Sequence, residues 1–193
     1  MLRSMRALLA LAMVCHLTGC GASGGGGGGV LNQLDTLPDE DGDTFSEVPP
    51  PEGVDFDVEN SVAVSITNTI TRSQAMAAAG SQLPSVVSSS ISLRADVAVD
   101  LTYPGGITQH LSGSFPIGPL DLAFEVACPE SIEVLVTLVA SAPLVGSRPV
   151  STFGPYVFTR GEGEYAYACG ALVSVSTFIN EATGEPDVDL DVE

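Results

Sequence analysis

The sequence contains no lysine and no tryptophan, and only two of its 193 residues are histidine. All six positive charges are therefore arginines, and 24 aspartate and glutamate residues oppose them, giving a formal net charge of −18. A chain this acidic repels nucleic acids and anionic lipid headgroups. We therefore expect no nucleic acid among its partners. Its length suffices for one domain.

No apolar run near the N-terminus is long enough to stay in a membrane. Behind the basic segment Met1–Arg6, the apolar stretch from Ala7 to Leu17 has 11 residues. A transmembrane helix needs about 20, so this stretch predicts a cleaved export signal over residues 1–19. The stretch ends in Leu17-Thr18-Gly19-Cys20, in which small residues precede a cysteine.

These four residues resemble the lipobox of bacterial lipoproteins, and the resemblance covers about the first 23 residues. It implies lipid attachment at Cys20, cleavage between Gly19 and Cys20, and acylation of the new amino group. By analogy with the sorting of enteric lipoproteins, Gly21 implies the outer membrane, on its periplasmic or surface face. Two or more acyl chains hold a protein stably on a membrane. The alternative is an ordinary secretory signal in which Cys20 is incidental.

The acidic residues gather in two flanks, ten within residues 35–59 and six within residues 181–193. Six consecutive glycines, Gly24–Gly29, precede the first flank, and Pro49–Pro51 lie near its end. Such a composition has high backbone entropy and little to bury. We therefore expect residues 20–59 to be a flexible, disordered tether and residues 181–193 an acidic tail or an edge strand.

Two features of these flanks suggest further hypotheses. Asp39–Asp43 surrounds Gly42 with carboxylates, but EF-hand spacing would place Leu37 and Val48 at ligand positions. A calcium-dependent adhesion or ligand-binding module is therefore only an alternative. Val54–Glu59 recurs, with Leu for Phe, as Val188–Glu193. Either segment, if extended, could be an edge strand that has one apolar and one acidic face.

Residues 60–180 alternate between apolar and polar side chains in a way that favours strands. From Ile91 to Tyr103 the period of two is sustained over 13 residues. An Ala-rich run, Ala75–Ala79 with Ser73 as N-cap, predicts one short helix, and Arg160–Gly163 predicts a hairpin turn. The chain is therefore expected to be all-β, an antiparallel β-sandwich of about seven strands. The other expected strands lie around 62–66, 120–126, 132–140, 150–159 and 165–179.

The four cysteines leave one pair for a disulfide. Cys15 would leave with the signal and Cys20 would carry lipid, so Cys128 and Cys169 remain in a chain exported to an oxidising compartment. Each follows the parity of apolar neighbours, so both thiols should face the core. A bridge between two inner faces would then join strands through the core and stabilise the fold by about 4 kcal/mol.

No motif in the folded part predicts catalysis. His110 has no Gly-x-Ser-x-Gly elbow and no evident acid partner, so we expect an exposed histidine on a strand or loop. Zinc or copper would lack ligands, and no cofactor is expected. The function we expect is a lipid-anchored envelope protein, not an enzyme, with a structural or binding role toward an envelope protein or glycan. A hydrolase with a carboxylate site is a second alternative, its candidates being Glu125, Glu133, Glu162 and Glu164.

Overall fold

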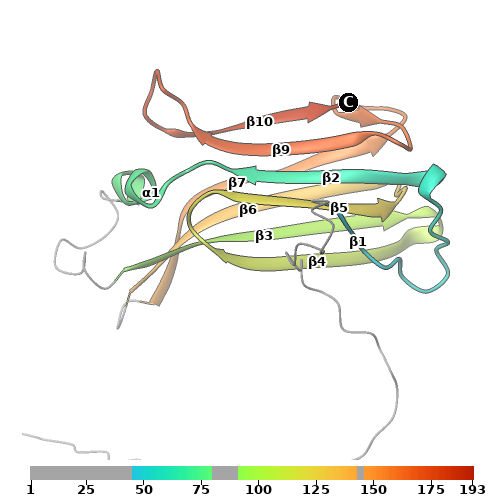
Figure 1. Ribbon diagram of the computed structural model, residues 1–193, viewed down its shortest axis with the longest axis horizontal. Helices are drawn as coiled ribbons and strands as arrows, with labels where there is room; N and C mark the ends of the chain where they lie inside the picture. Colours follow the sequence, from blue (N-terminus) through green and yellow to red (C-terminus); the bar gives the residue numbers. More distant parts are fainter. Residues whose placement is uncertain (1–44, 80–90, 143–145) are drawn as a thin grey trace, which may run out of the picture. The chain divides into compact units, whose positions relative to one another are not determined.

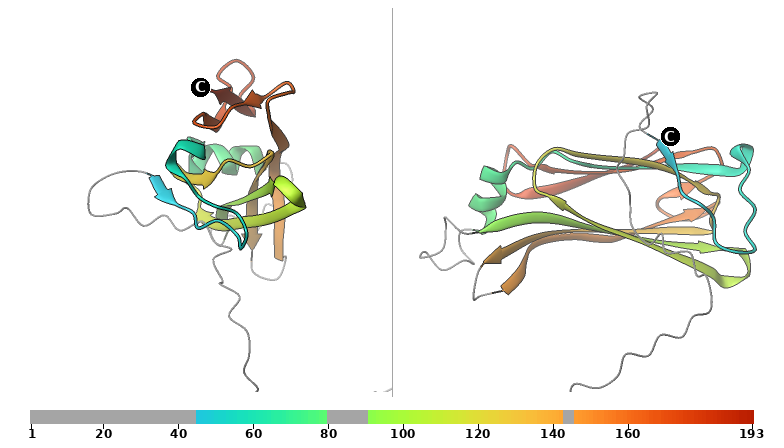
Figure 2. Two further views of the ribbon diagram at one scale, coloured as in Figure 1. Left: turned by 90° about the vertical axis from the view of Figure 1, so that its right-hand side faces the viewer. Right: turned by 60° about the horizontal axis from the view of Figure 1, so that its bottom comes forward.

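The computed structural model describes residues 45–79, 91–142 and 146–193. They form two five-stranded sheets (Figure 1), sheet A in the order β4-β3-β6-β7-β8 and sheet B in the order β1-β5-β2-β9-β10. The right-hand view of Figure 2 separates the layers, with β3, β6 and β7 in one and β2, β5 and β9 in the other. The expected all-β sandwich is confirmed. The strands are β1 (Phe45–Glu47), β2 (Ser61–Asn68), β3 (Ser92–Tyr103), β4 (Ile107–Pro116), β5 (Leu120–Ala127), β6 (Ser131–Ala142), β7 (Gly146–Arg160), β8 (Ala166–Tyr167), β9 (Leu172–Ile179) and β10 (Pro186–Val192).

One hydrophobic core lies between the inner faces of the two sheets. Strand β3 contributes every second residue to it, because consecutive side chains of a strand point to opposite faces. The predicted alternation over 91–103 is confirmed, since Val97, Val99 and Leu101 are at most 2% exposed. Strand β6, expected to be central, lies between β3 and β7.

Both sheets are mixed rather than purely antiparallel, and the described residues form ten strands rather than about seven. Three pairs are parallel: β1 with β5, β2 with β9, and β7 with β8. Alternation reports which residues face the core, but it carries no information about the direction of a neighbouring strand. The sequence pattern therefore predicted the strands and not their partners.

The segment 165–179, expected as one strand, is split between the two sheets. Strand β8 pairs with β7 in sheet A, and β9 pairs with β2 in sheet B. Between them, Ala171 N donates to Ala168 O at 3.1 Å, and Gly170 has a φ of +88°. The prediction of a hairpin turn at Arg160–Gly163 is wrong. A hairpin joins antiparallel strands, whereas β8 runs parallel to β7, with Thr159 opposite Ala166.

The one α-helix in the described residues, α1 (Arg72–Ala79), begins two residues earlier than the Ser73 cap implied. Gln74 N donates to Thr71 Oγ1 at 3.4 Å, and Thr71 N donates to Gln74 Oε1 at 2.8 Å. This reciprocal pair is a capping box, which makes Thr71 the N-cap. With eight residues, α1 is too short to cross a membrane, and the described chain contains no helix that could.

Residues 45–59, expected as part of the tether, instead belong to the folded domain. Strand β1 pairs with β5, Val48 N donates to Glu125 O at 3.0 Å, and Gln109 Nε2 donates to Pro49 O at 3.0 Å. Val54 and Phe56 pack on the core. The sequence prediction rested on the acidic, proline-rich composition of this segment, and that composition gives no sign of the apolar contacts made by Val54 and Phe56. The rest of the expected tether lies outside the described residues.

The two acidic hexapeptides differ in structure. Residues 54–59 form a loop that enters a 3₁₀ turn, Val58–Asn60, in which Asp57 accepts a hydrogen bond from Glu59 N at 3.1 Å. Residues 188–192 belong instead to β10, which pairs with β9 at the edge of sheet B. Only the second copy is therefore a strand, although both have the same alternating sequence.

Candidate functional site

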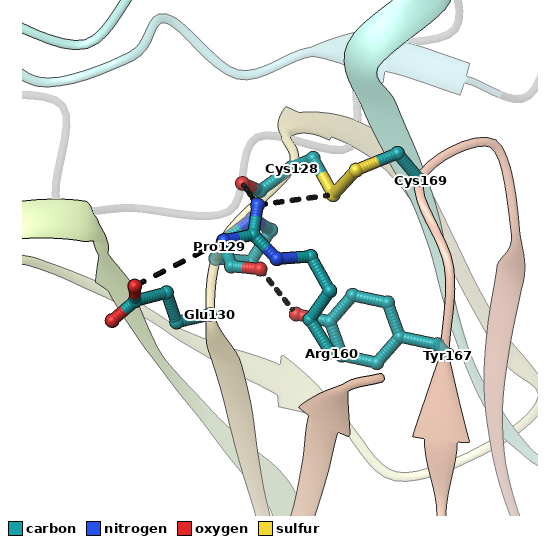
Figure 3. Close-up of a disulfide and its surroundings, with 6 residues drawn as sticks. All are labelled: Cys128, Pro129, Glu130, Arg160, Tyr167 and Cys169. Atoms are coloured by element: carbon teal, nitrogen blue, oxygen red, sulfur yellow. Dashed lines mark hydrogen bonds and ion pairs between the residues drawn. A yellow bond between two sulfur atoms is a disulfide. The ribbon is translucent and has the colours of Figure 1, made fainter. Parts of the chain in front are cut away.

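The disulfide lies at one end of the sandwich (Figure 3). Cys128 and Cys169 are bonded, as predicted, with Cα atoms 5.5 Å apart. Cys128 follows β5 and Cys169 precedes β9, the two strands on either side of β2. Cys128 N donates to Asn60 O at 2.8 Å, and Gly170 N donates to Ser61 O at 2.7 Å. The bond therefore joins the segments next to β5 and β9 across the start of β2, within sheet B, and does not join the two sheets through the core.

Polar side chains around the disulfide hold the backbone there. Figure 3 shows Arg160 and Tyr167 reaching toward the chain near Pro129, where Tyr167 Oη donates to Pro129 O at 2.8 Å. Arg160 lies 3.9 Å from a carboxylate oxygen of Glu130. Burial is the main cause that raises the pKa of Tyr167 well above its usual value. These contacts stabilise the end of the sandwich.

A shallow, open groove of about 490 Å³ crosses the outer face of sheet A. It runs over β4, β3 and β6. Val97, Ala98, Gly113 and Leu135 are its apolar and glycine lining residues. Ser112 lies opposite Ala98 in the register of β4 with β3, so the middle of the groove also carries a hydroxyl. Arg94, Asp96, Ser114 and Thr137 supply polar atoms along one margin.

A hydrogen-bonded network fixes one margin of the groove. Arg94 Nε donates to Asp96 Oδ1 at 2.8 Å and Arg94 Nη2 donates to Oδ2 at 3.2 Å, a bidentate pair. Ser114 Oγ donates to Asp96 Oδ1 at 2.6 Å, and Arg94 Nη1 donates to Ser141 Oγ at 3.0 Å. Burial opposes ionisation of Asp96, but the bonds from Arg94 and Ser114 outweigh it, and the pKa of Asp96 is lowered. Asp96 is therefore an ionised, oriented acceptor at neutral pH.

His110 and Asp100 lie on the same face of sheet A, one row beyond Ala98 and Ser112, and are not among the residues that line the groove. They are opposite each other on β4 and β3, and His110 Nδ1 lies 2.6 Å from Asp100 Oδ1. Both side chains are about half exposed, 52% and 56%. The exposed position on a strand agrees with the expectation, but the sequence offered no acid partner because the partner is ten residues away and is set by strand register.

The four candidate carboxylates for hydrolysis do not gather at one site. Glu133 lies on the outer face of sheet A, opposite Asp100, whereas Glu125 lies on β5 in sheet B. Glu162 and Glu164 are exposed in the turn between β7 and β8. Among the residues that the structure describes, no group of three or more His, Cys, Asp or Glu residues could hold a metal ion. Gly19, Cys20 and the acidic run Asp39–Asp43 lie outside the described residues.

Sequence reasoning missed the groove itself. Alternation did place Arg94, Asp96 and Asp100 on a wet face, but it did not indicate that they face Ser114, Thr137 and His110. That information lies in the register of β3 with β4 and β6. No family model, curated protein or solved structure matches this chain.

Proposed function

We propose that this chain is an exported, lipid-anchored protein of the bacterial cell envelope whose β-sandwich has a binding role there. The observation that carries this proposal is the disulfide between Cys128 and Cys169. Structural disulfides form and persist in oxidising compartments and are rare in the cytosol. The bond therefore supports export, which is also what the apolar run Ala7–Leu17 indicates.

The lipobox-like residues supply the anchor in this proposal. Lipid on Cys20 would hold the chain at a membrane, by analogy the outer membrane. Residues 20–44 then form the spacer, since β1 begins at Phe45. A flexible chain of that length spans roughly 25–30 Å. The sandwich would thus act away from the bilayer, with the outer face of sheet A as its binding surface.

The anchor is tested by replacing Cys20 with serine in the full chain expressed in a bacterium. We expect the Cys20→Ser protein to lose incorporation of an alkyne-labelled fatty acid and to move from the membrane fraction to the soluble fraction. Cys15→Ser is the matched control, because it removes a cysteine five residues away in the signal. It should keep both the label and the membrane fraction. A Cys20→Ser protein that keeps its lipid label would refute the anchor.

A further inference from the structure

Four strands form the edges of the two sheets, and β4 differs from the other three. Strands β1 and β8 have three and two residues, too few to pair with a further strand over any length. Strand β10 carries aspartates, two of which accept hydrogen bonds from N–H groups of the strand itself. Strand β4 has ten residues and no Asp, Glu, Lys or Arg among them. It therefore lacks the charges by which proteins block an exposed edge.

The backbone of β4 presents unused hydrogen-bonding groups at this edge. Ile117 N donates to Leu93 O at 3.2 Å, and bonded positions alternate along an antiparallel pair. The odd-numbered residues of β4 therefore bond to β3, and the backbone groups of the even-numbered residues point to the free edge. Pro116, which has no N–H, occupies one of these edge positions. The edge positions that offer both N–H and C=O include Thr108, His110 and Ser114.

The neighbouring described residues leave these three positions without a backbone partner. Ser112 also lies at the edge, but it has an interaction of its own and is not counted among them. The segment near Pro49 reaches β4 from the core side, since the Gln109 side chain that donates to Pro49 O also accepts from the buried Tyr103 hydroxyl. In the part of the chain that the structure describes, no backbone hydrogen bond links that segment to positions 108, 110 or 114.

The β4 strand of a second molecule of this chain fits the edge in antiparallel orientation. With Leu111 on a two-fold axis, Thr108 of each molecule faces Ser114 of the other, so their free backbone groups can bond. The inward side chains also match, because Ile107 then faces Phe115 of the second molecule. Ile107 and Phe115 are only partly buried within one molecule, and aromatic side chains paired with β-branched ones stabilise neighbouring strands. The edge is therefore complementary to itself.

The charge near β4 also permits a second molecule, although the chain carries a net charge of −18. Asp96 and Asp100 lie directly beside β4 in sheet A, and both have partners. Arg94 donates to Asp96, and His110 Nδ1 lies 2.6 Å from Asp100 Oδ1. The aspartates of β10 lie at the opposite border of the molecule (Figure 1). Repulsion between like charges is therefore lower at β4 than it would be at β10.

We infer that β4 is an interface at which two molecules of this chain pair edge to edge and join their A sheets into one continuous sheet. This inference goes beyond the proposed function, and the strand pairing does not depend on it. Facing residues point to the same side of the joined sheet, so the two outer faces become one surface. One strand from each molecule buries little area, so the dimer is weak in solution, and a membrane anchor would favour it by concentrating the chains.

The test is a disulfide cross-link between two molecules in isolated bacterial membranes. The double variant Thr108→Cys, Ser114→Cys puts thiols at facing positions, where bonded antiparallel residues have Cα atoms about 5.5 Å apart, within the range of a disulfide. Along one strand the same positions are about 20 Å apart, so this bond forms only between molecules. Mild oxidation with copper phenanthroline should give a covalent dimer on a non-reducing gel.

Control variants show whether the cross-link is specific. Thr108→Cys alone and Ser114→Cys alone should give little dimer, because like positions lie about 20 Å apart across the axis. Ser131→Cys, Thr137→Cys is the matched control, since it makes the same two kinds of substitution six residues apart on the outward side of the central strand β6. It should give no more dimer than the single variants. Thermal melting before oxidation checks that each variant is folded.

Hydrogen exchange of the unmodified mature protein measures the same contact without any substitution. Peptides that cover residues 107–116 should exchange more slowly as the protein concentration rises, because the N–H groups at the edge become bonded. Peptides that cover residues 186–192 should exchange at the same rate throughout. Mass spectrometry of the digested protein gives both rates.

The inference is overturned if the Thr108→Cys, Ser114→Cys variant gives no covalent dimer, or if the β6 control gives as much. Exchange over residues 107–116 that does not depend on concentration would also contradict it. A cross-linked product whose mass is not twice that of the chain would assign the edge to a strand of another protein instead. The lipid label on Cys20 is measured in the same membranes, so loss of the dimer and loss of the anchor are seen separately.

Discussion

Asn68 shows how a single polar residue can organise the core. It lies at the end of β2 with 2% exposure, and its amide joins three parts of the chain. Asn68 Nδ2 donates to Gly118 O at 2.7 Å in the turn before β5, and Thr177 Oγ1 on β9 donates to Asn68 Oδ1 at 2.8 Å. Buried polar groups are costly unless they are paired, and here each has a partner.

We predict that Asn68→Leu lowers the free energy of unfolding by about 2–4 kcal/mol, because it removes the hydrogen bonds of Asn68 with Gly118 O, Ile70 N and Thr177 Oγ1. The Thr177 hydroxyl would keep only its 3.5 Å bond to Thr67 O. Chemical denaturation monitored by circular dichroism measures this change. Asn60→Leu is the control, because the Asn60 side chain is exposed, and it should change stability by less than about 0.5 kcal/mol. Equal effects of the two substitutions would contradict the role assigned to Asn68.

Strand β10 illustrates how an element at the edge of a sheet is protected. Glu193 exchanges both backbone hydrogen bonds with Leu172, and bonded positions alternate in an antiparallel pair. The N–H groups of Val188 and Val192 therefore point to the free edge. Asp187 Oδ1 accepts from Val188 N at 2.9 Å, and Asp191 Oδ1 accepts from Val192 N at 3.0 Å. The carboxylates thus cover donors that another strand would use.

We predict that the triple variant Asp187→Thr, Asp189→Thr, Asp191→Thr self-associates at micromolar concentration. It loses three negative charges at the edge strand and the carboxylates that accept hydrogen bonds from Val188 N and Val192 N. Analytical ultracentrifugation at neutral pH measures the change. Threonine at Asp55, Asp57 and Glu59 is the control, since it removes the same number of charges from the related segment that is not a strand. Association of the control to the same extent would assign the effect to net charge alone.

At the scale of the whole molecule, the disulfide stabilises the fold mainly by lowering the conformational entropy of the unfolded chain. Cys128 and Cys169 are 41 residues apart. Within that loop lie β6, β7 and β8, which belong to sheet A, although the bond itself joins the ends of β5 and β9, which flank β2 in sheet B. Closing such a loop lowers the conformational entropy of the unfolded chain, in segments that later form both sheets.

We predict that the double variant Cys128→Ala, Cys169→Ala is less stable by about 4 kcal/mol, a large part of the roughly 5–15 kcal/mol that stabilises a domain. Its melting temperature should fall by about 10 °C, as measured by differential scanning calorimetry. Unmodified protein treated with a reductant should approach the same value. A melting temperature unchanged in both cases would show that the bond does not stabilise the fold.

The sequence alone determined the fold class, the existence of strands β3 and β6, and the pairing of Cys128 with Cys169. These follow from local rules, since a strand alternates its side chains with a period of two whatever lies beside it. The short stretch 45–48 escaped detection because three or four residues carry too little periodicity against an acidic, proline-rich background.

Only the tertiary structure decided which strands lie together and in which direction. It placed β8 and β9 in different sheets, made β7 and β8 parallel, and brought His110 to Asp100 and Ser114 to Asp96. These contacts depend on register between strands, which is selected by packing of the whole core and not by the residues of one strand. The outer face of sheet A, where we propose binding, therefore exists only once the sheet is assembled.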